Sequence, residues 1–207
     1  MAREKLSTQI RRDQILDVVL KLIATRGTCS LRMTRVARQV GLVPSALYRH
    51  FKNRDEIIDA AIDRFQAMVL ANFRLAAQES RSAQERLHLL LRRQMEIIRE
   101  NQINALPRIV FSEDLYGNRP QRKAKVYRML KNNLSRLENC FRDGQLRGEF
   151  RKELDPRAAA RMFLAILQSS AILWFVSNGT IDVMGNAEAA WVLMKNAMAA
   201  RASKASL

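Results

Sequence analysis

The sequence predicts an all-α protein with a small N-terminal unit of three helices, residues 1–54, and a larger C-terminal helical domain, residues 55–207. Two observations lead to this fold class. The composition is 48% hydrophobic and 27% charged, but only 6% aromatic, with 7 Gly and 4 Pro, so residues typical of strands and turns are scarce. In addition, apolar residues recur at helical spacing along most of the chain.

The first helix is expected over residues 7–26, and Gly27 is placed to end it. Two short helices follow over 33–40 and 44–51, joined by a turn that contains Gly41. Helices this short are not stable alone, so they must pack against the first helix. The pair has the pattern of a helix-turn-helix unit. Its inward side chains are expected to be Ala37, Leu42, Leu47 and Phe51.

The rest of the chain is expected to be helical as well. Asn53 or Asp55 is placed to cap a long helix that begins there. Breaks in the pattern at glycine and proline separate the later helices. The expected ranges are 55–78, 83–101, 103–112, 121–147, 156–178 and 185–201.

Positive charge is concentrated near the N-terminus. Lys and Arg number 36 against 20 Asp and Glu, which gives a formal net charge of +16. Residues 1–54 hold twelve of these bases and only three of the acids, a net charge of +9 in about a quarter of the chain. Such an excess favours a polyanionic partner, either nucleic acid or an acidic membrane surface.

The helix expected at 44–51 has the side chains that a DNA-recognition helix needs. Leu47 and Phe51 are one turn apart and face inward, which leaves the other side for DNA. Arg49 is the best candidate for reading a base, because its guanidinium can pair with a guanine edge. Small side chains at the helix start would let it enter a major groove, and polar ones beside it would reach phosphates. The candidates are Pro44, Ser45, Ala46, Tyr48, Arg49, His50, Lys52 and Arg54.

Residues 9–65 resemble the TetR family of bacterial transcriptional regulators. The resemblance is carried by "RRDQILDVVLKLIATRG" and by "TRVARQVGLVPSALYRHFKNRDEII". A weaker family element is similar to "CFRDGQLRGEFRKELDPRAAA", residues 140–160. The resemblance implies an all-α homodimer that binds double-stranded operator DNA, with a C-terminal domain that dimerises and encloses a pocket for a small effector.

By position, the resemblance adds Thr34 to the candidate DNA contacts and supports the candidates in the recognition helix and Arg54. The sequence departs from the family at two helix starts. Val43 stands where the family usually has Ser, Thr or Asp, so the capping hydrogen bond is expected to be missing there. Leu31 stands where a threonine is common before the preceding helix.

A dimer interface is also expected from composition, because the segment 157–177 is apolar on nearly every side and needs more cover than one chain supplies at its edge. The alternative is that this segment is the central core helix of a monomer. The last helix is expected to join it in a four-helix interface. The candidate interface residues are Phe163, Leu167, Trp174, Trp191, Met194 and Met198.

The effector pocket implied by the resemblance is the least defined site. Its candidate residues, each of which has core packing as the alternative, are Met68, Met95, Phe111, Tyr116, Tyr127 and Phe141. This set favours an apolar or amphipathic effector. Glu113 and Asp114 are either the counter-charge of a cationic effector or a solvated helix end.

Other classes of function are disfavoured. With only two Cys and two His at unsuitable spacing, neither a metal site, a cofactor nor a disulfide is expected, and a cytoplasmic location is indicated. The N-terminus lacks a signal-peptide core, and the apolar run 162–176 is short and interrupted, so a membrane span is not expected. No nucleophile or phosphate-loop motif is present, so an enzyme with an anionic substrate is disfavoured. The resemblance to the TetR family therefore implies a ligand-responsive transcriptional repressor that its effector releases from DNA. An activator, an architectural DNA-binding protein and a protein of acidic membrane surfaces are the alternatives.

Overall fold

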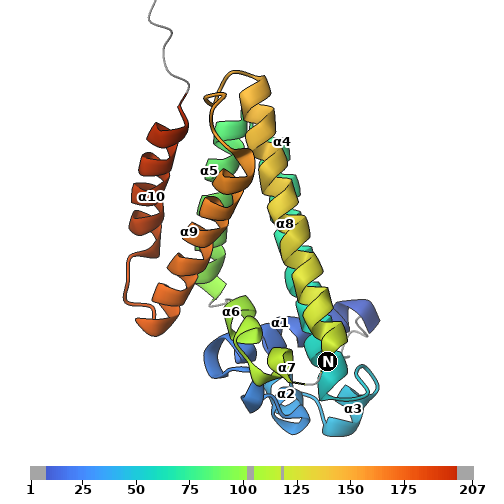
Figure 1. The fold of residues 1–207 in the computed structure, drawn as a ribbon. Helices are drawn as coiled ribbons and strands as arrows, with labels where there is room; N and C mark the ends of the chain where they lie inside the picture. Colours follow the sequence, from blue (N-terminus) through green and yellow to red (C-terminus); the bar gives the residue numbers. More distant parts are fainter. Residues whose placement is uncertain (1–7, 102–104, 118, 200–207) are drawn as a thin grey trace, which may run out of the picture. The chain divides into compact units, whose positions relative to one another are not determined.

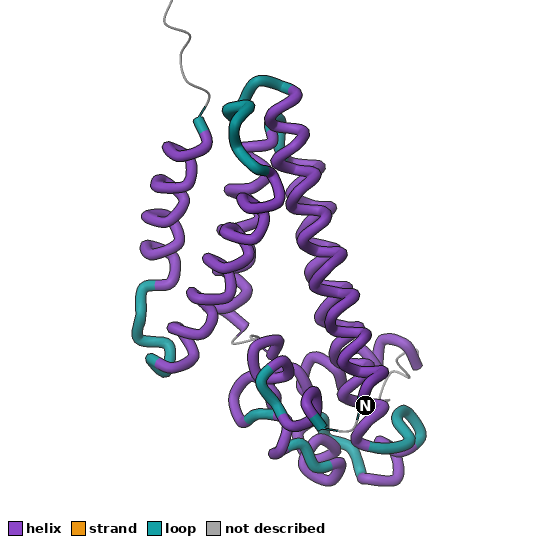
Figure 2. The backbone as a smooth tube through the Cα atoms, in the orientation of Figure 1, coloured by secondary structure: helices purple, strands orange, loops and turns teal. Residues whose placement is uncertain are grey.

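The computed structural model describes residues 8–101, 105–117 and 119–199, and the fold in this part of the chain is all-α (Figures 1 and 2). No strand occurs among these residues; two of them, Phe150 and Ala199, form an isolated bridge. The helices are α1 (Thr8–Arg26), a 3-10 turn η1 (Thr28–Ser30), α2 (Met33–Gln39), α3 (Pro44–Tyr48), α4 (Arg54–Glu79), α5 (Ala83–Asn101), α6 (Ala105–Val110), α7 (Glu113–Tyr116), α8 (Pro120–Leu146), α9 (Pro156–Val176) and α10 (Val183–Met198).

The chain forms two compact units, Met1–Leu70 with Asn101–Val126 and Ala71–Glu100 with Tyr127–Leu207. Helices α4 and α8 each continue from the first unit into the second. The domain boundary predicted between residues 54 and 55 stays a prediction. The two units are defined by packing and do not test it.

The first unit is built around α1, which packs against η1, α2 and α6. The apolar face of α1, from Ile15 to Ile23, is buried. The start of α4 adds buried side chains to the same unit, among them Ile57 and Ile58, both 0% exposed. Asn53 caps α4, since its Oδ1 accepts a hydrogen bond of 2.9 Å from the backbone N–H of Glu56.

The second unit has an aromatic centre. The ring of Phe141 lies 5.8 Å from that of Phe150 and 6.5 Å from that of Phe163, in tilted and edge-on arrangements that favour aromatic pairs. Gly144 has no room for a side chain, because an added Cβ would overlap the Phe150 ring. This requirement explains the glycine in the last turn of α8.

Helix α9 is only partly covered by its own chain. Met162, Leu173 and Val176 are 63%, 51% and 69% exposed, although α9 packs against α10. It is also the one described helix long and apolar enough to cross a membrane, a test that core helices of soluble proteins pass too. The exposed side of α9 therefore disagrees with the alternative in which this segment is the central core helix of a monomer.

Most predicted helices are confirmed within one to three residues, with two corrections. The recognition helix ends at Tyr48 instead of Phe51. The helix predicted at 103–112 is in fact two short helices, α6 and α7, separated at Phe111 and Ser112. Ser112 begins the second of these with extended backbone, and its hydroxyl donates to the Ile109 carbonyl.

Candidate DNA-binding site

The turn between α2 and α3 is held by its backbone. Gly41 has a φ of +66°, a left-handed conformation that favours glycine, and the Leu42 N–H donates to the Ala37 carbonyl at 2.8 Å. Val43 precedes α3 with no side-chain cap bond, as its sequence predicts, and Pro44 occupies the first turn. These features fix where α3 begins.

The inner side of the helix-turn-helix is closed by apolar side chains. Ala37 and Leu47 are 0% exposed and Phe51 is 1% exposed. Ala46 is also buried, at 7%, so its methyl group packs inside the unit. The prediction that Ala46 touches DNA is corrected accordingly, because a side chain held in the core presents no surface to a base.

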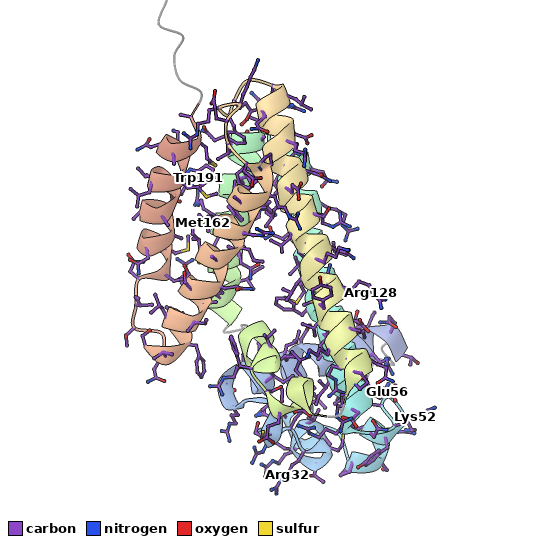
Figure 3. All side chains as sticks on the ribbon, in the orientation of Figure 1. Arg32, Lys52, Glu56, Arg128, Met162 and Trp191 are labelled. Atoms are coloured by element: carbon purple, nitrogen blue, oxygen red, sulfur yellow. The ribbon has the colours of Figure 1, made fainter. Side chains whose placement is uncertain are left out.

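The outer side of the same unit carries most of the other predicted DNA contacts. Tyr48 is 51% exposed at the end of α3. The remaining exposed members are Thr34, Pro44, Ser45, Arg49 and Lys52. Lys52 is labelled in Figure 3, as is exposed Arg32, which directly precedes α2. The structure thus brings six of the nine predicted contacts onto the exposed part of one helix-turn-helix, which we call the recognition surface.

Arg12 of α1 supports the end of the recognition surface. Its guanidinium donates to the His50 carbonyl, lies 4.1 Å from the centre of the Phe51 ring and is 3.6 Å from a Glu56 oxygen. The carboxylate of Glu56 in turn accepts a 2.8 Å hydrogen bond from the backbone N–H of Lys52. These contacts fix the backbone that presents Lys52.

His50 lies half-buried at this edge, and burial, followed by the charges of Arg12, Arg11 and Arg49, lowers its pKa below 6.5. Its Nδ1 is buried and has no hydrogen-bond partner among the described residues. A ring that stays neutral at pH 7 can contact a phosphate by a hydrogen bond but adds no charge to it.

Arg54 is not an open phosphate contact, which corrects the sequence prediction. Its Nε donates to the Leu31 carbonyl at 3.1 Å, and Nη2 donates to the Thr28 carbonyl at 2.7 Å. Its two terminal nitrogens also donate to Asp114, at 2.6 and 2.8 Å. Four of the five N–H groups of the guanidinium are therefore used inside the unit. Arg54 joins α4 to η1, to Leu31 at the end of η1, and to α7.

Asp114 belongs to the same structural network. The hydrogen bonds from Arg54 lower its pKa from 3.8 to about 2. Arg122, whose side chain is 3% exposed, donates to the Asp114 carbonyl and, at 2.6 Å, to the carboxylate of Asp59. A role for Asp114 as counter-charge of a cationic effector is excluded by these partners. The sequence signal for the network was the spacing of acids at 55, 59 and 63, one turn apart at the start of α4.

The six predicted effector contacts are dispersed. Met95 and Phe141 are both 0% exposed and pack in the core of the second unit, whereas Phe111 and Tyr127 are 71% and 69% exposed. Met68 is half-buried in α4. The side chain of Tyr116 lies outside the described residues. The other five do not line the pocket of α9 and α10.

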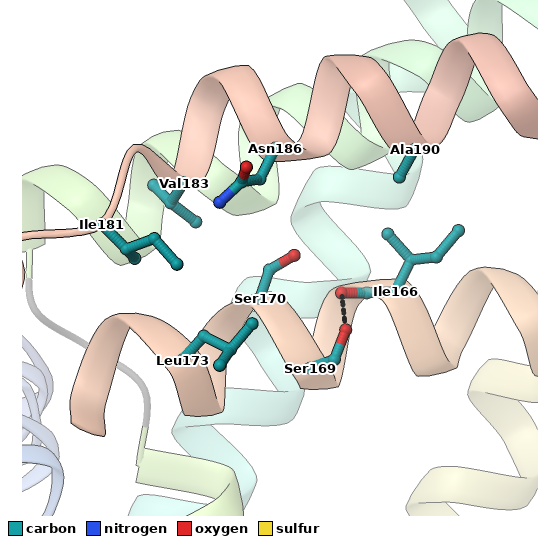
Figure 4. A pocket seen from close by; sticks show the side chains of 8 residues that line it. All are labelled: Ile166, Ser169, Ser170, Leu173, Ile181, Val183, Asn186 and Ala190. Carbon is teal, nitrogen blue, oxygen red and sulfur yellow. Dashed lines mark hydrogen bonds between the residues drawn. The ribbon is translucent and has the colours of Figure 1, made fainter. Parts of the chain in front are cut away.

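That pocket, of about 300 Å³, lies between α9 and α10 (Figure 4). Ile166, Ser170 and Leu173 of α9 face Val183, Asn186 and Ala190 of α10 across it. Leu173 is half exposed, so the pocket opens on the uncovered apolar side of these two helices. No cluster of three or more His, Cys, Asp or Glu suited to a metal ion occurs in the described part of the chain.

Three of the predicted dimer contacts are corrected by their burial. Phe163, Trp191 and Met198 are 1%, 5% and 2% exposed, so they pack inside their own chain. The His88 ring lies parallel to the Trp191 ring at 4.9 Å, and Glu188 is hydrogen-bonded to His88 at 2.8 Å. Leu167, Trp174 and Met194 are half-buried. The exposed apolar residues of α9 and α10, which sequence reasoning missed, are Met162, Ile172, Leu173, Phe175, Val176, Val192 and Leu193.

Solved structures of similar fold include FadR from Bacillus subtilis in complex with stearoyl-CoA, which is 21% identical, has a TM-score of 0.73 and is matched over 89% of this chain and 98% of its own. A TetR-family regulator from Agrobacterium tumefaciens reaches a TM-score of 0.79 at 15% identity, over 94% and 100% of the two chains. At these identities the likeness establishes the fold.

Sequence relatives extend over nearly the whole chain. HTH-type transcriptional regulator TtgR from Pseudomonas putida is 28% identical over 92% of this chain and 91% of its own length. The fatty acid metabolism regulator protein of Bacillus subtilis is 22% identical, over 83% and 87%. The family model "Bacterial regulatory proteins, tetR family" matches residues 15–61, and "Tetracyclin repressor-like, C-terminal domain" matches residues 80–198. Because these models match both parts of the chain, it belongs to the TetR family of transcriptional regulators, which are DNA-binding proteins and not enzymes.

Proposed function

We propose that the protein represses transcription as a homodimer that binds a roughly palindromic operator through α3 and is released from it by a small effector. The observation that carries this proposal is the recognition surface, whose exposed side chains stand on a helix-turn-helix with a closed apolar inner side. A surface of this kind combines one side chain able to read a base, Arg49, with donors and a cation for phosphates. In this proposal the protein acts in the cytoplasm, where bacterial DNA is found.

Within this surface we assign different roles to its members. Arg49 reads a base edge in the major groove, where its guanidinium can pair with guanine. Tyr48 and Thr34 donate to phosphates, and Lys52 adds a positive charge beside the backbone. Pro44 and Ser45, small and exposed at the start of α3, let the helix approach the bases.

The dimer is proposed to form through the exposed apolar residues of α9 and α10, not through those buried inside the chain. Met162, Leu173, Val192 and Leu193 are each more than half exposed, and such a large apolar surface is typical of a protein interface. Dimerisation gives operator binding its geometry, because two copies of α3 must reach major grooves about 34 Å apart.

An effector acts, in this proposal, by binding the DNA-free arrangement of the dimer more tightly than the DNA-bound one. An apolar or amphipathic small molecule suits a helical domain of this composition. Two neighbours in fold were solved with coenzyme A thioesters, FadR with stearoyl-CoA and AibR with isovaleryl coenzyme A and operator DNA. Acyl-CoA compounds are therefore the first class to test.

The proposal is tested by fluorescence anisotropy with labelled DNA from upstream of the protein's own gene and a shuffled duplex as competitor. We expect the native duplex to bind at least ~10³-fold more tightly, the low end for specific regulators, and stearoyl-CoA or isovaleryl-CoA to release it. Equal binding of both duplexes, weakening together between 50 and 200 mM salt, would instead support an architectural protein on this DNA. Effector-strengthened binding would contradict release of the DNA by the effector.

A further inference from the structure

Asn72 of α4 is a buried polar side chain in the second unit with an unused acceptor. It is 8% exposed. Its Nδ2 lies 3.5 Å from the Leu90 carbonyl of α5, at the outer limit for a hydrogen bond, and its Oδ1 has no hydrogen-bond partner among the residues that the structure describes.

Positions close to Asn72 along α4 and around its contact on α5 belong to an apolar core. One turn further along α4 lies Ala76, which is 0% exposed, and the contacted part of α5 contributes Leu87, Leu90 and Leu91 to the same apolar core. A leucine would suit such a position without any polar atom to satisfy. An amide oxygen left unpaired there costs free energy, and groups of this kind in native proteins have a partner, which is protein, water or ligand.

A second asparagine provides a comparison within the same unit. Asn133 of α8 is buried to the same degree, at 7% exposed, and it does interact with its surroundings. Burial of an asparagine in this unit therefore does not by itself leave the residue without an interaction. The unused acceptor is a particular feature of Asn72.

We propose that Asn72 is the polar anchor of the effector site, with Oδ1 accepting a hydrogen bond from an O–H or N–H group of a mostly apolar effector. The proposal rests on the proposed function, in that it assumes a small effector, and it adds the residue and the kind of group recognised. The donor group is uncharged, because a cation among these side chains would be buried without a counter-charge. Neutral alcohols, phenols and secondary amides on an apolar frame meet this requirement.

The test uses pairs of compounds in which a methyl group in one member replaces the donor hydrogen of the other. We choose decan-1-ol with decyl methyl ether, 4-phenylphenol with 4-methoxybiphenyl, and N-methyldecanamide with N,N-dimethyldecanamide. In calorimetric titrations, the wild-type protein is expected to bind the donor member of at least one pair about three- to tenfold more tightly, the ratio that one net hydrogen bond provides. Asn72→Leu and Asn72→Ala are both expected to bind the two members equally.

Asn133→Leu is the matched control and is expected to keep the wild-type preference. The proposal is overturned if the wild-type protein shows no preference in any pair. It is also overturned if both Asn72 variants keep the preference. Another residue would then accept the hydrogen bond from the compound, and water would be the partner of Asn72. Two variants are used because leucine is larger and alanine smaller than asparagine, so one of them retains the fold if the other does not.

The DNA titration with the same variants separates this inference from the proposed function. Both Asn72 variants are expected to bind operator DNA like the wild type, while their release by the preferred alcohol or amide should require about three- to tenfold more of the compound. If the wild-type protein shows no specific DNA binding, the proposed function fails, but the calorimetric preference still decides the role of Asn72. If DNA binding is specific and the preference is missing, only the inference about Asn72 fails.

Discussion

Arg54 at the start of α4 and Asp114 in α7 form a two-point ion pair, with nitrogen-to-oxygen distances of 2.6 and 2.8 Å. The same guanidinium donates to the carbonyls of Thr28, which begins η1, and Leu31, which follows η1 on the way to α2. The pair therefore connects the base of the helix-turn-helix to α7. A change at Asp114 is expected to reach the recognition surface through these bonds.

Asp114→Asn is expected to lower the free energy of unfolding by about 2–4 kcal/mol. The variant leaves Arg54 and the 3% exposed Arg122 without a carboxylate that both approach, and breaking a buried pair is costly, although Arg54 is one-third exposed and part of the loss is screened. Urea unfolding followed by circular dichroism measures the change. Asp63→Asn is the control, because Asp63 is 65% exposed and pairs with Lys125 at the surface. Equal stability of the two variants would contradict the structural role of Asp114.

The same carboxylate predicts a pH dependence. The pKa of Asp114 is about 2 in the folded protein, below its ordinary value of 3.8, so its contribution to stability is present above about pH 4 and is lost as the pH falls toward 2. The amide introduced by Asp114→Asn would resemble the protonated acid at every pH. The difference in Tm between wild type and this variant is therefore expected to narrow from pH 5 to pH 3. A difference that stays constant over this range would show that Asp114 is not titrating against Arg54.

Much of the fold could be predicted because helical periodicity is a local property. The buried face of α1 and the closed inner side of the helix-turn-helix follow from residues three and four apart. The contacts of Arg54 could not be predicted in this way. Basic residues beside a recognition helix are normally read as phosphate contacts, and its partner Asp114 is 60 residues away in sequence.

The dimer-interface residues were predicted incorrectly for a different reason. Helix α9 is apolar on nearly all sides, so its pattern does not indicate which side faces its own core. Phe163 is 1% exposed and its neighbour Met162 is 63% exposed, although both are large and apolar.

The unused acceptor of Asn72 could not be predicted either. Whether Oδ1 has a hydrogen-bond partner depends on the groups that α5 places beside it, and the periodicity of the sequence does not contain that information.

Arg49→Ala is expected to weaken operator binding by about 5- to 150-fold, which corresponds to the ~1–3 kcal/mol of a base contact, and to relax the preference at one base position. Arg49 is exposed beyond α3, so its removal leaves the inner apolar side unchanged. Anisotropy titrations against the operator and single-base variants measure both effects. Arg142→Ala in α8, an exposed arginine of the other unit, removes the same charge as a control. Unchanged operator affinity would remove Arg49 from the site.

Lys52→Ala is expected to act differently, because a lysine beside the DNA backbone attracts phosphates without reading sequence. Affinity should fall to a similar extent for the operator and for shuffled DNA. The slope of log affinity against log salt should decrease in magnitude by about 1, the release of about one counterion. Titrations from 50 to 200 mM salt measure the slope. A loss confined to the operator would assign Lys52 to base recognition.

Leu193→Glu is expected to weaken dimerisation by about 30-fold or more, because a central apolar contact of an interface contributes ~2 kcal/mol or more and a charge there is desolvated without a partner. Leu193 is 73% exposed on α10, so the single chain should keep its fold and its far-ultraviolet circular dichroism. Sedimentation velocity at several protein concentrations measures the dimer population, and operator affinity should fall with it because two half-sites are then no longer joined. Leu146→Glu is the matched control: Leu146 is 86% exposed at the end of α8, outside the α9 and α10 surface. If both variants sediment as the wild type does, the exposed residues of α10 are not the dimer interface.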